Sequence, residues 1–253
     1  MTEALVTSRR DDDIVTLTLN RPERHNALVP ELLDALRAAL AACSQEPPRA
    51  LILAAEGRSF SSGGDVGGFY ACPQSERRRY SQRIVGQLNQ TILDLLRLPC
   101  PSVAAVHGMV TGGSIGLVLA CDIAVVGPKA SFAPWYVNVG YSPDGGWTAL
   151  MPERIGRARA LDVQLLNHAI SADEALHWGL ATRQAEDGQV LAEALRLAHT
   201  LRGKIPGSVR RTLQLTRPDP ERVAASLDAE LQNFLDQIET GEADRGMAAF
   251  LGK

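Results

Sequence analysis

Strand and helix patterns alternate along the first 130 residues, and this alternation is the feature that most restricts the fold. The first 20 residues read as two strands, and in DIVTLTLN (13–20) apolar side chains alternate with threonines, as in a half-buried strand. A helix pattern begins at Pro30. A buried strand, a long amphipathic helix and two more strands follow, at 49–55, 77–97, 100–108 and 122–126. Such an order predicts an α/β fold with crossover connections.

After about residue 145 the pattern becomes almost wholly helical. The stretch PERVAASLDAELQNFLDQIET (220–240) has a wide apolar face made of Val223, Ala224, Leu227, Leu231, Phe234, Leu235 and Ile238. Such a face must pack on something, so we expect this helix either to dock on the rest of the chain or to form a subunit contact. We divide the chain into a core at 1–195 and a C-terminal helical segment at 196–253.

Composition and charge argue against several classes of function. The net charge is −3 and the pI is about 6.0, without a basic stripe, so no nucleic-acid partner is expected. The N-terminus lacks the apolar region of a signal peptide, and no apolar run is long enough for a membrane span. The four cysteines and five histidines are scattered, which favours free thiols in a cytoplasmic protein without a metal site.

Two glycine-rich segments each follow a predicted strand. FSSGGD (60–65) comes after the strand at 50–55, and VTGGSIG (110–116) comes after the strand at 102–106 and runs into a helix. The first N–H groups of a helix have no partner within it. Two such loops at one sheet edge could aim two backbone donors at a single oxygen, as an oxyanion hole does. The alternative is that the glycines only make tight turns; neither loop matches a dinucleotide or phosphate-binding pattern.

Taken together, these segments resemble the crotonase family, also called the enoyl-CoA hydratase/isomerase superfamily. The resemblance is carried by LNRPERHNALVPEL, GRSFSSGGDV, AAVHGMVTGGSIGLVLACDIAV, the stretch from SFAPWYVNVGYSPDGG to GLATR, and RGMAAFLGK. It implies a spiral of strand-strand-helix turns followed by C-terminal helices that mediate trimers. It also implies an acyl-CoA substrate, no cofactor besides the coenzyme A of that substrate, and a homotrimer or homohexamer.

The resemblance also implies roles for particular residues. The backbone N–H groups of Gly64 and Gly113 would hold the thioester oxygen and stabilise an enolate. Arg24, Ala27 and Leu28, in RPERHNAL, would lie against the nucleotide end of coenzyme A. The remaining substrate-binding positions implied by the motifs, with the tail residues expected to reach the nucleotide, are Ser62, Gly63, Asp65, Val66, Phe250 and Lys253.

The chain departs from the family's hydratases at two positions. Where those enzymes carry catalytic glutamates, this sequence has Gly116 and Tyr136. Water addition to a double bond normally needs one group to activate water and another to deliver the proton. We expect Gly116 to leave room for a bulky acyl group, and Tyr136 to form a wall of the pocket rather than act as an acid.

Asp144, in SPDGG, is the remaining candidate for acid–base chemistry. Pro-Asp-Gly is also ordinary turn chemistry, so a solvated turn is the alternative. The segment resembles family members with a single acid here, among them enoyl-CoA isomerases, the 1,2-epoxyphenylacetyl-CoA isomerase type and 4-chlorobenzoyl-CoA dehalogenase. Aromatic neighbours would desolvate the carboxyl group and raise its pKa. These neighbours are Trp135, Tyr136, Tyr141 and Trp147.

The leading hypothesis is therefore an acyl-CoA isomerase that moves a double bond through an enolate, with Asp144 as the base. Three alternatives stay open: a hydratase that pairs Asp144 with Tyr136, a dehalogenase with Asp144 as nucleophile, and a coenzyme A-binding protein without catalysis. Other polar residues receive structural interpretations. Asp65 should order its own loop, Asp122 should be structural, His107 should be hydrogen-bonded in the core, and ERRRY (76–80) should be a solvated helix face.

Overall fold

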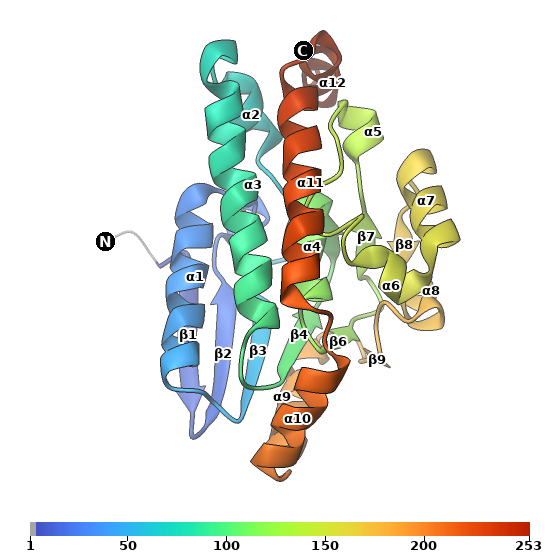
Figure 1. The fold of residues 1–253 in the computed structure, drawn as a ribbon. Helices are drawn as coiled ribbons and strands as arrows, with labels where there is room; N and C mark the ends of the chain where they lie inside the picture. The colour runs from blue at the N-terminus through green and yellow to red at the C-terminus, as the bar shows by residue number, and fades with distance from the viewer. Residues whose placement is uncertain (1–3) are drawn as a thin grey trace.

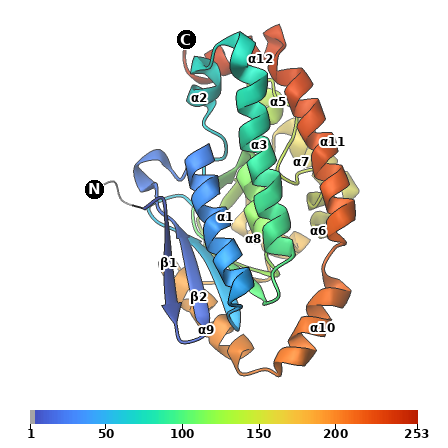
Figure 2. The same cartoon turned by 60° about the vertical axis from the view of Figure 1, so that its left-hand side comes forward.

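The computed structural model describes residues 4–253, which form two β-sheets covered by helices (Figures 1 and 2). The larger sheet has the strand order β1-β2-β3-β4-β6-β9, and the smaller has the order β5-β7-β8. In the larger sheet only β1 and β2 pair antiparallel; the remaining neighbours are parallel. The strands are β1 (Val6–Asp11), β2 (Ile14–Leu19), β3 (Ala50–Ala55), β4 (Ser102–Val106), β5 (Met109–Thr111), β6 (Ile123–Val126), β7 (Ser131–Ala133), β8 (Ile170–Ser171) and β9 (Arg183–Gln184). The α/β prediction is confirmed.

Helices cover both faces of the larger sheet. On one face α1 and α3 pack together, and α11 lies beside α3 (Figures 1 and 2). On the other face α9 places Val190, Ala194 and Ala198 against β3, β4 and β6. The helices are α1 (Pro30–Gln45), α2 (Val66–Ala71), α3 (Gln74–Leu96), α4 (Ile115–Leu119), α5 (Tyr136–Val139), α6 (Met151–Ile155), α7 (Arg157–Leu166), α8 (Ala172–Trp178), α9 (Val190–Arg202), α10 (Pro206–Thr216), α11 (Pro220–Ile238) and α12 (Gly241–Phe250).

The local sequence accounts for the first half of this order. Every residue of β3 except the last is buried, as expected for a strand with helices on both faces. Helix α1 begins at Pro30, whose missing N–H is no loss in the first turn. Its buried face consists of Pro30, Leu32, Leu33, Leu36, Leu40 and Cys43, which recur at helical spacing.

Some expected boundaries are wrong. Helix α2 begins at Val66, directly after the first glycine loop, where no helix was predicted. The Asp65 carboxylate accepts a hydrogen bond from the Gly68 N–H and caps this helix. The second glycine loop follows β5 in the smaller sheet rather than β4 directly. Two strands of two residues each, β8 and β9, interrupt the region expected to be helical. Strands this short leave too little alternation to be seen in a sequence.

The apolar face of α11 docks on the same chain. Its residues Val223, Leu227, Leu231, Phe234, Leu235 and Ile238 are buried, and the helix packs against α3. Of the two expected partners for this face, the rest of the chain is the one observed, because α3 covers it and no subunit contact is needed to bury it. The division placed after residue 195 falls inside α9.

The charged run at 76–80 is a solvated helix face only in part, because Glu76 and Arg79 are exposed whereas Arg77 and Arg78 pair within the chain. Arg77 is only 5% exposed and pairs with Asp244 of α12, while Arg78 donates to Asp236 and Glu239 at 3.2 and 2.7 Å. The C-terminal helices supply these carboxylates, so the run becomes part of an interface within the chain.

Asp122 is structural, as expected. It forms a bidentate ion pair with Arg217, in which each of the two hydrogen bonds is 2.7 Å long. Within residues 4–253, no helix is both long and apolar enough to cross a membrane.

Candidate active site

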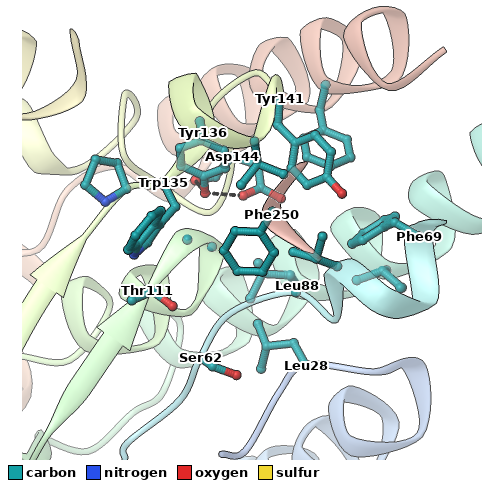
Figure 3. A pocket seen from close by; sticks show the side chains of 18 of the residues that line it. Leu28, Ser62, Phe69, Leu88, Thr111, Trp135, Tyr136, Tyr141, Asp144 and Phe250 are labelled. Carbon is teal, nitrogen blue, oxygen red and sulfur yellow. Dashed lines mark hydrogen bonds between the residues drawn. The ribbon is translucent and has the colours of Figure 1, made fainter. Parts of the chain in front are cut away.

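A cavity of about 190 Å³ lies where the two glycine loops meet the helices α2, α3, α5, α11 and α12 (Figure 3). Its lining is mostly apolar, with side chains such as Leu28, Leu88 and Phe234. The predicted site residues Ser62, Gly64 and Val66 line it from the first loop. A further group of predicted residues completes the lining: Gly113, Tyr136, Asp144 and Phe250. The structure thus brings most of the expected site together around one apolar space.

Backbone hydrogen bonds hold the first glycine loop between Leu28 on one side and the second glycine loop on the other. On one side, the Leu28 N–H donates to the Gly63 carbonyl at 2.8 Å, and Leu28 pairs with Gly64 in a parallel bridge. The bonds of such a bridge go to the neighbours of Gly64, so the N–H of Gly64 itself points away from Leu28. No residue in 4–253 accepts a hydrogen bond from it. Because Gly64 lines the cavity, this free donor is available to a ligand there.

The second loop packs closely against the first. The Thr111 N–H donates to the Ser61 carbonyl at 3.1 Å, and a Cβ atom at Gly63 would lie only 2.4 Å from the Thr111 oxygen. Gly113 sits in a 3₁₀ turn, Gly112–Ser114, that continues into α4. The first N–H groups of such a turn lack partners within it. The two glycine loops therefore bring Gly64 and Gly113, the expected oxyanion donors, to the same cavity.

Asp144 is buried rather than solvated, with 7% of its surface exposed. The Tyr136 hydroxyl donates to the Asp144 carbonyl oxygen at 3.0 Å and to its carboxylate Oδ1 (Figure 3). Burial raises the pKa of Asp144 to about 7, against the lowering effect of the Tyr136 hydrogen bond and with a further rise from the charge of Glu230. A Cβ atom at Gly113 would lie 2.8 Å from Asp144 Oδ1, so the carboxyl group adjoins the proposed oxyanion donor.

Tyr136 donates a hydrogen bond to the Asp144 carboxylate and is a weaker acid than a free tyrosine. Its side chain is buried, and burial together with the charge of Asp144 raises its pKa well above the usual value. It also lines the cavity, as expected for a pocket wall. Tyr136 therefore stays protonated at neutral pH and fixes the orientation of Asp144.

Glu230, on α11, holds the loop that carries Asp144. Its carboxylate accepts hydrogen bonds from Gly146 N, Thr148 N, Thr148 Oγ1 and Ala149 N at 2.6–2.9 Å. The side chain is almost wholly buried. Sequence reasoning missed this residue, although a signal was present: Glu230 lies within the apolar face, between Leu227 and Phe234 at helical spacing. A charged residue at such a position has to find buried partners.

The aromatic residues near Asp144 differ in whether they line the cavity. Trp147 is fully buried, does not line the cavity, and donates from Nε1 to the Gly112 carbonyl at 2.9 Å. It therefore supports the second glycine loop and is not part of the expected wall around Asp144. Trp135 lines the cavity and meets Phe250 edge-on, with ring centroids 6.0 Å apart (Figure 3). Tyr141 lines the cavity from the other side of Asp144.

Gly116 does not make room for an acyl group. It does not line the cavity, and a Cβ atom there would lie 2.4 Å from both the Gly145 oxygen and Ile92 Cδ1. The absent side chain lets α4 approach the Asp144 loop and α3. The glycine is explained by this packing, and the expectation of substrate contact was wrong.

The remaining predicted residues lie around the cavity rather than in it. Arg24 is largely exposed, with Nη2 3.6 Å from Asp65 Oδ2, while Asp65 caps α2. Ala27 is buried beside Leu28, and Lys253 places Nζ 4.4 Å from the centroid of the Tyr70 ring. His107 is partly exposed, contrary to the core position expected, and bonds the Gly57 carbonyl at 2.8 Å.

Comparison with known proteins identifies relatives along nearly the whole chain. A family model described as enoyl-CoA hydratase/isomerase matches residues 9–253. A probable enoyl-CoA hydratase of Mycobacterium bovis is 36% identical over 227 residues, covering 87% of this chain and 78% of the relative. A 4-chlorobenzoyl coenzyme A dehalogenase of Arthrobacter is 28% identical, covering 96% of this chain and 88% of the relative. A 1,2-epoxyphenylacetyl-CoA isomerase of Escherichia coli is also 28% identical, with 98% and 95% covered.

Solved structures share the fold. An enoyl-CoA hydratase from Bacillus halodurans superposes with a TM-score of 0.90 at 25% identity, covering 97% of this chain and 99% of the other. The spiral fold expected from the sequence, with its C-terminal helices, is therefore confirmed. The relatives include hydratases, dehalogenases and an isomerase, so their names favour no single reaction.

Proposed function

The chain belongs to the enoyl-CoA hydratase/isomerase family, whose members named above act on acyl-CoA thioesters, and on that premise we propose that it is an acyl-CoA isomerase. The proposed reaction moves a carbon–carbon double bond through a thioester enolate. One observation carries the proposal: Asp144 is the only carboxyl group that lines the cavity within residues 4–253, and it adjoins Gly113. A proton shift needs one such group, whereas water addition normally needs two.

The proposed mechanism uses each of these groups in turn. The N–H groups of Gly64 and Gly113 hold the thioester oxygen of a 3-enoyl-CoA. The Asp144 carboxylate takes a proton from carbon 2, and the electron pair of that C–H bond passes into the enolate. The double bond then forms between carbons 2 and 3 as the same proton is returned to carbon 4. Tyr136 engages Asp144 Oδ1, which leaves Oδ2 for the proton transfer.

The burial of Asp144 suits it to this role. A base works best when its pKa lies near the working pH, since it must both hold and release the proton. The pKa of about 7 for Asp144, caused chiefly by burial, meets that requirement. The apolar lining of the cavity also strengthens the interaction of the developing enolate with backbone donors.

The other reactions lack a second participant. A hydratase would need a further acid or base, and the two positions at which family hydratases carry glutamates hold Gly116 and Tyr136. A dehalogenase that forms an ester on Asp144 would need a base to activate water. None of the five histidines, all within the described residues, lines the cavity.

Incubation with three thioesters tests the proposal. Trans-3-hexenoyl-CoA, crotonyl-CoA and 4-chlorobenzoyl-CoA are substrates for the isomerase, hydratase and dehalogenase reactions, respectively. The proposed function requires conversion of the first to its 2-enoyl isomer, with the other two turned over much more slowly. Rapid hydration of crotonyl-CoA, or release of chloride, would replace the isomerase with the corresponding alternative.

The rate should depend on pH through Asp144. Its carboxylate must be ionised in the free enzyme, and burial raises its pKa to about 7. We therefore expect kcat/KM to rise about tenfold per pH unit below that value and to level off above it. The profile is measured with trans-3-hexenoyl-CoA from pH 5 to 9. A profile already level at pH 5 would show that no group of raised pKa acts as the base.

We also propose that the chain assembles as a homotrimer or homohexamer. Support comes from α10, which has no buried residue and lies at the lower end of the molecule in Figure 2. Ile205, just before it, is 71% exposed, and Leu215 within it is 86% exposed. Light scattering at micromolar concentration should give three or six times the 27.2 kDa of one chain. A stable mass of one chain would refute the assembly but not the reaction.

A further inference from the structure

We propose that Glu230 is a positioning residue for the reaction, which fixes the separation between the Asp144 carboxylate and the Gly113 N–H from outside the cavity. Glu230 does not line the cavity, so it has no contact with a substrate there. It acts instead through the loop 144–149. For turnover of a 3-enoyl-CoA this inference rests on the proposed function, whereas the hold of Glu230 on Asp144 does not depend on which reaction Asp144 serves.

The two carboxylate oxygens of Glu230 hold separate parts of this loop. Oε2 accepts one hydrogen bond, from the Gly146 N–H at 2.8 Å, whereas Oε1 accepts three, from Thr148 N, Thr148 Oγ1 and Ala149 N at 2.6–2.9 Å. All four partners are donors, and only 4% of Glu230 is exposed, so an ionised carboxylate is the group that satisfies them. The loop therefore cannot shift without breaking charge-assisted hydrogen bonds to α11.

The same loop is in direct contact with the second glycine loop. Gly145 follows Asp144, and a Cβ atom there would lie only 2.4 Å from both Cα and the carbonyl oxygen of Gly113. Trp147, from the same loop, donates from Nε1 to the Gly112 carbonyl at 2.9 Å. The loop is thus confined between Glu230 on one side and the second glycine loop on the other. This confinement sets the distance from the base to the oxyanion donor.

Glu230 also places a negative charge beside a base whose other neighbours are neutral. Tyr136 and Tyr141 flank Asp144, and burial raises the pKa of both hydroxyl groups, so they stay protonated. From α3 the cavity receives the apolar side chain of Leu88. Burial is the main cause of the raised pKa of Asp144, the Tyr136 hydrogen bond opposes it, and the charge of Glu230 adds to it. Removing that charge should therefore lower the pKa of Asp144.

Glu230→Gln tests the position of the loop with little change of shape. The glutamine oxygen is needed where Thr148 and Ala149 donate, so the NH₂ group faces the Gly146 N–H, and two donors then oppose each other. The loop beside Asp144 has to shift. A displacement of about 1 Å costs on the order of 10²-fold in rate. With trans-3-hexenoyl-CoA, kcat should fall about 10²-fold while KM stays within about twofold, because the cavity lining is unchanged.

Glu230→Asp separates position from charge. It keeps the charge and both acceptor oxygens, but its side chain is one methylene shorter and cannot hold the loop at the same place. We expect kcat to fall about tenfold or more. The pH midpoint of kcat/KM should stay near the wild-type value of about 7 in Glu230→Asp and move to lower pH in Glu230→Gln. A purely structural role would not divide the two variants in this way.

Glu221→Gln is the matched control, because it makes the same chemical change on the same helix. The Glu221 side chain is 82% exposed and pairs with Arg97, so kcat, KM and the pH midpoint should all stay at wild-type values. Melting temperatures establish that the variants are folded, and Glu230→Asp, which leaves no two donors opposed, serves alone if Glu230→Gln does not fold. The positioning role is refuted if the folded Glu230 variants keep wild-type kcat, or if KM rises as much as kcat falls.

Titration of Asp144 without substrate separates this inference from the proposed function. Carbon-13 NMR of protein labelled at the aspartate carboxyl carbon gives the titration midpoint, and the Asp144 signal is identified by its absence in Asp144→Asn. If wild type does not isomerise the thioester but the midpoint falls in Glu230→Gln alone, the isomerase proposal fails and the hold of Glu230 on Asp144 stands. If wild type isomerises and the Glu230 variants match it in kcat and midpoint, the isomerase stands and the role of Glu230 fails. An inactive wild type with no change of midpoint refutes both.

Discussion

Asp144→Asn should bind acyl-CoA thioesters about as tightly as wild type and turn them over about 10²–10⁴ times more slowly, the usual effect of a positioned acid or base. The amide keeps the shape of the side chain, and the donors at Gly64 and Gly113 remain. It cannot, however, accept the proton from the α-carbon. Turnover of trans-3-hexenoyl-CoA and exchange of α-deuterium from solvent are the two measurements, and both should fall together.

Asp228→Asn is the matched control for this experiment. Asp228 lies on the exposed side of α11, two residues from Glu230, so the same chemical change should leave turnover unchanged. An Asp144→Asn enzyme that exchanges and isomerises at wild-type rates would make Asp144 a buried turn residue. An aryl ester trapped on Asp144 in wild type would instead identify a nucleophile, and with it the dehalogenase reaction.

Gly64→Pro should lower kcat by about 10²–10³, the effect of removing one donor from an oxyanion hole. Proline deletes an N–H that has no partner in residues 4–253, at a residue that lines the cavity. Gly64→Ala adds the same Cβ but keeps the N–H. That Cβ would meet only the Phe69 ring, at 3.0 Å from Cε2, and this side chain can shift slightly. Alanine should therefore retain most of the activity that proline loses.

The comparison of the two variants separates the donor from the added bulk. Circular dichroism and the melting temperature establish that both are folded, and stopped-time assays with trans-3-hexenoyl-CoA give kcat and KM. A loss that is equal in Gly64→Ala and Gly64→Pro would mean that space at this position matters and the N–H does not.

The parts of the site that lie in short segments could be predicted from the sequence. FSSGGD and VTGG each fix a loop, and Pro-Asp-Gly among aromatic residues indicates a carboxyl group of unusual environment. The apolar face of α11 was visible too, but periodicity shows only that a face is covered. It does not say whether the cover is α3 of the same chain or another subunit.

Contacts between distant segments could not be predicted. Glu230 meets Gly146 across 84 positions, and Arg77 meets Asp244 across 167. Each depends on how α11 and α12 pack, which no local pattern encodes. Gly116 was misinterpreted for the same reason, because the atoms that exclude a side chain there belong to Gly145 and Ile92.

The position of Glu230 has a consequence for how the protein is made. A ribosome releases the chain from its N-terminus, so the loop with Asp144 emerges long before the residue that holds it, 84 positions later. Phe234 and Phe250, which line the cavity, emerge later still. The nascent chain can thus build its sheets while its reactive carboxyl group is not yet held in place. Catalytic competence should begin only after these C-terminal residues have left the ribosome and packed, which couples activity to the folding of α11 and α12.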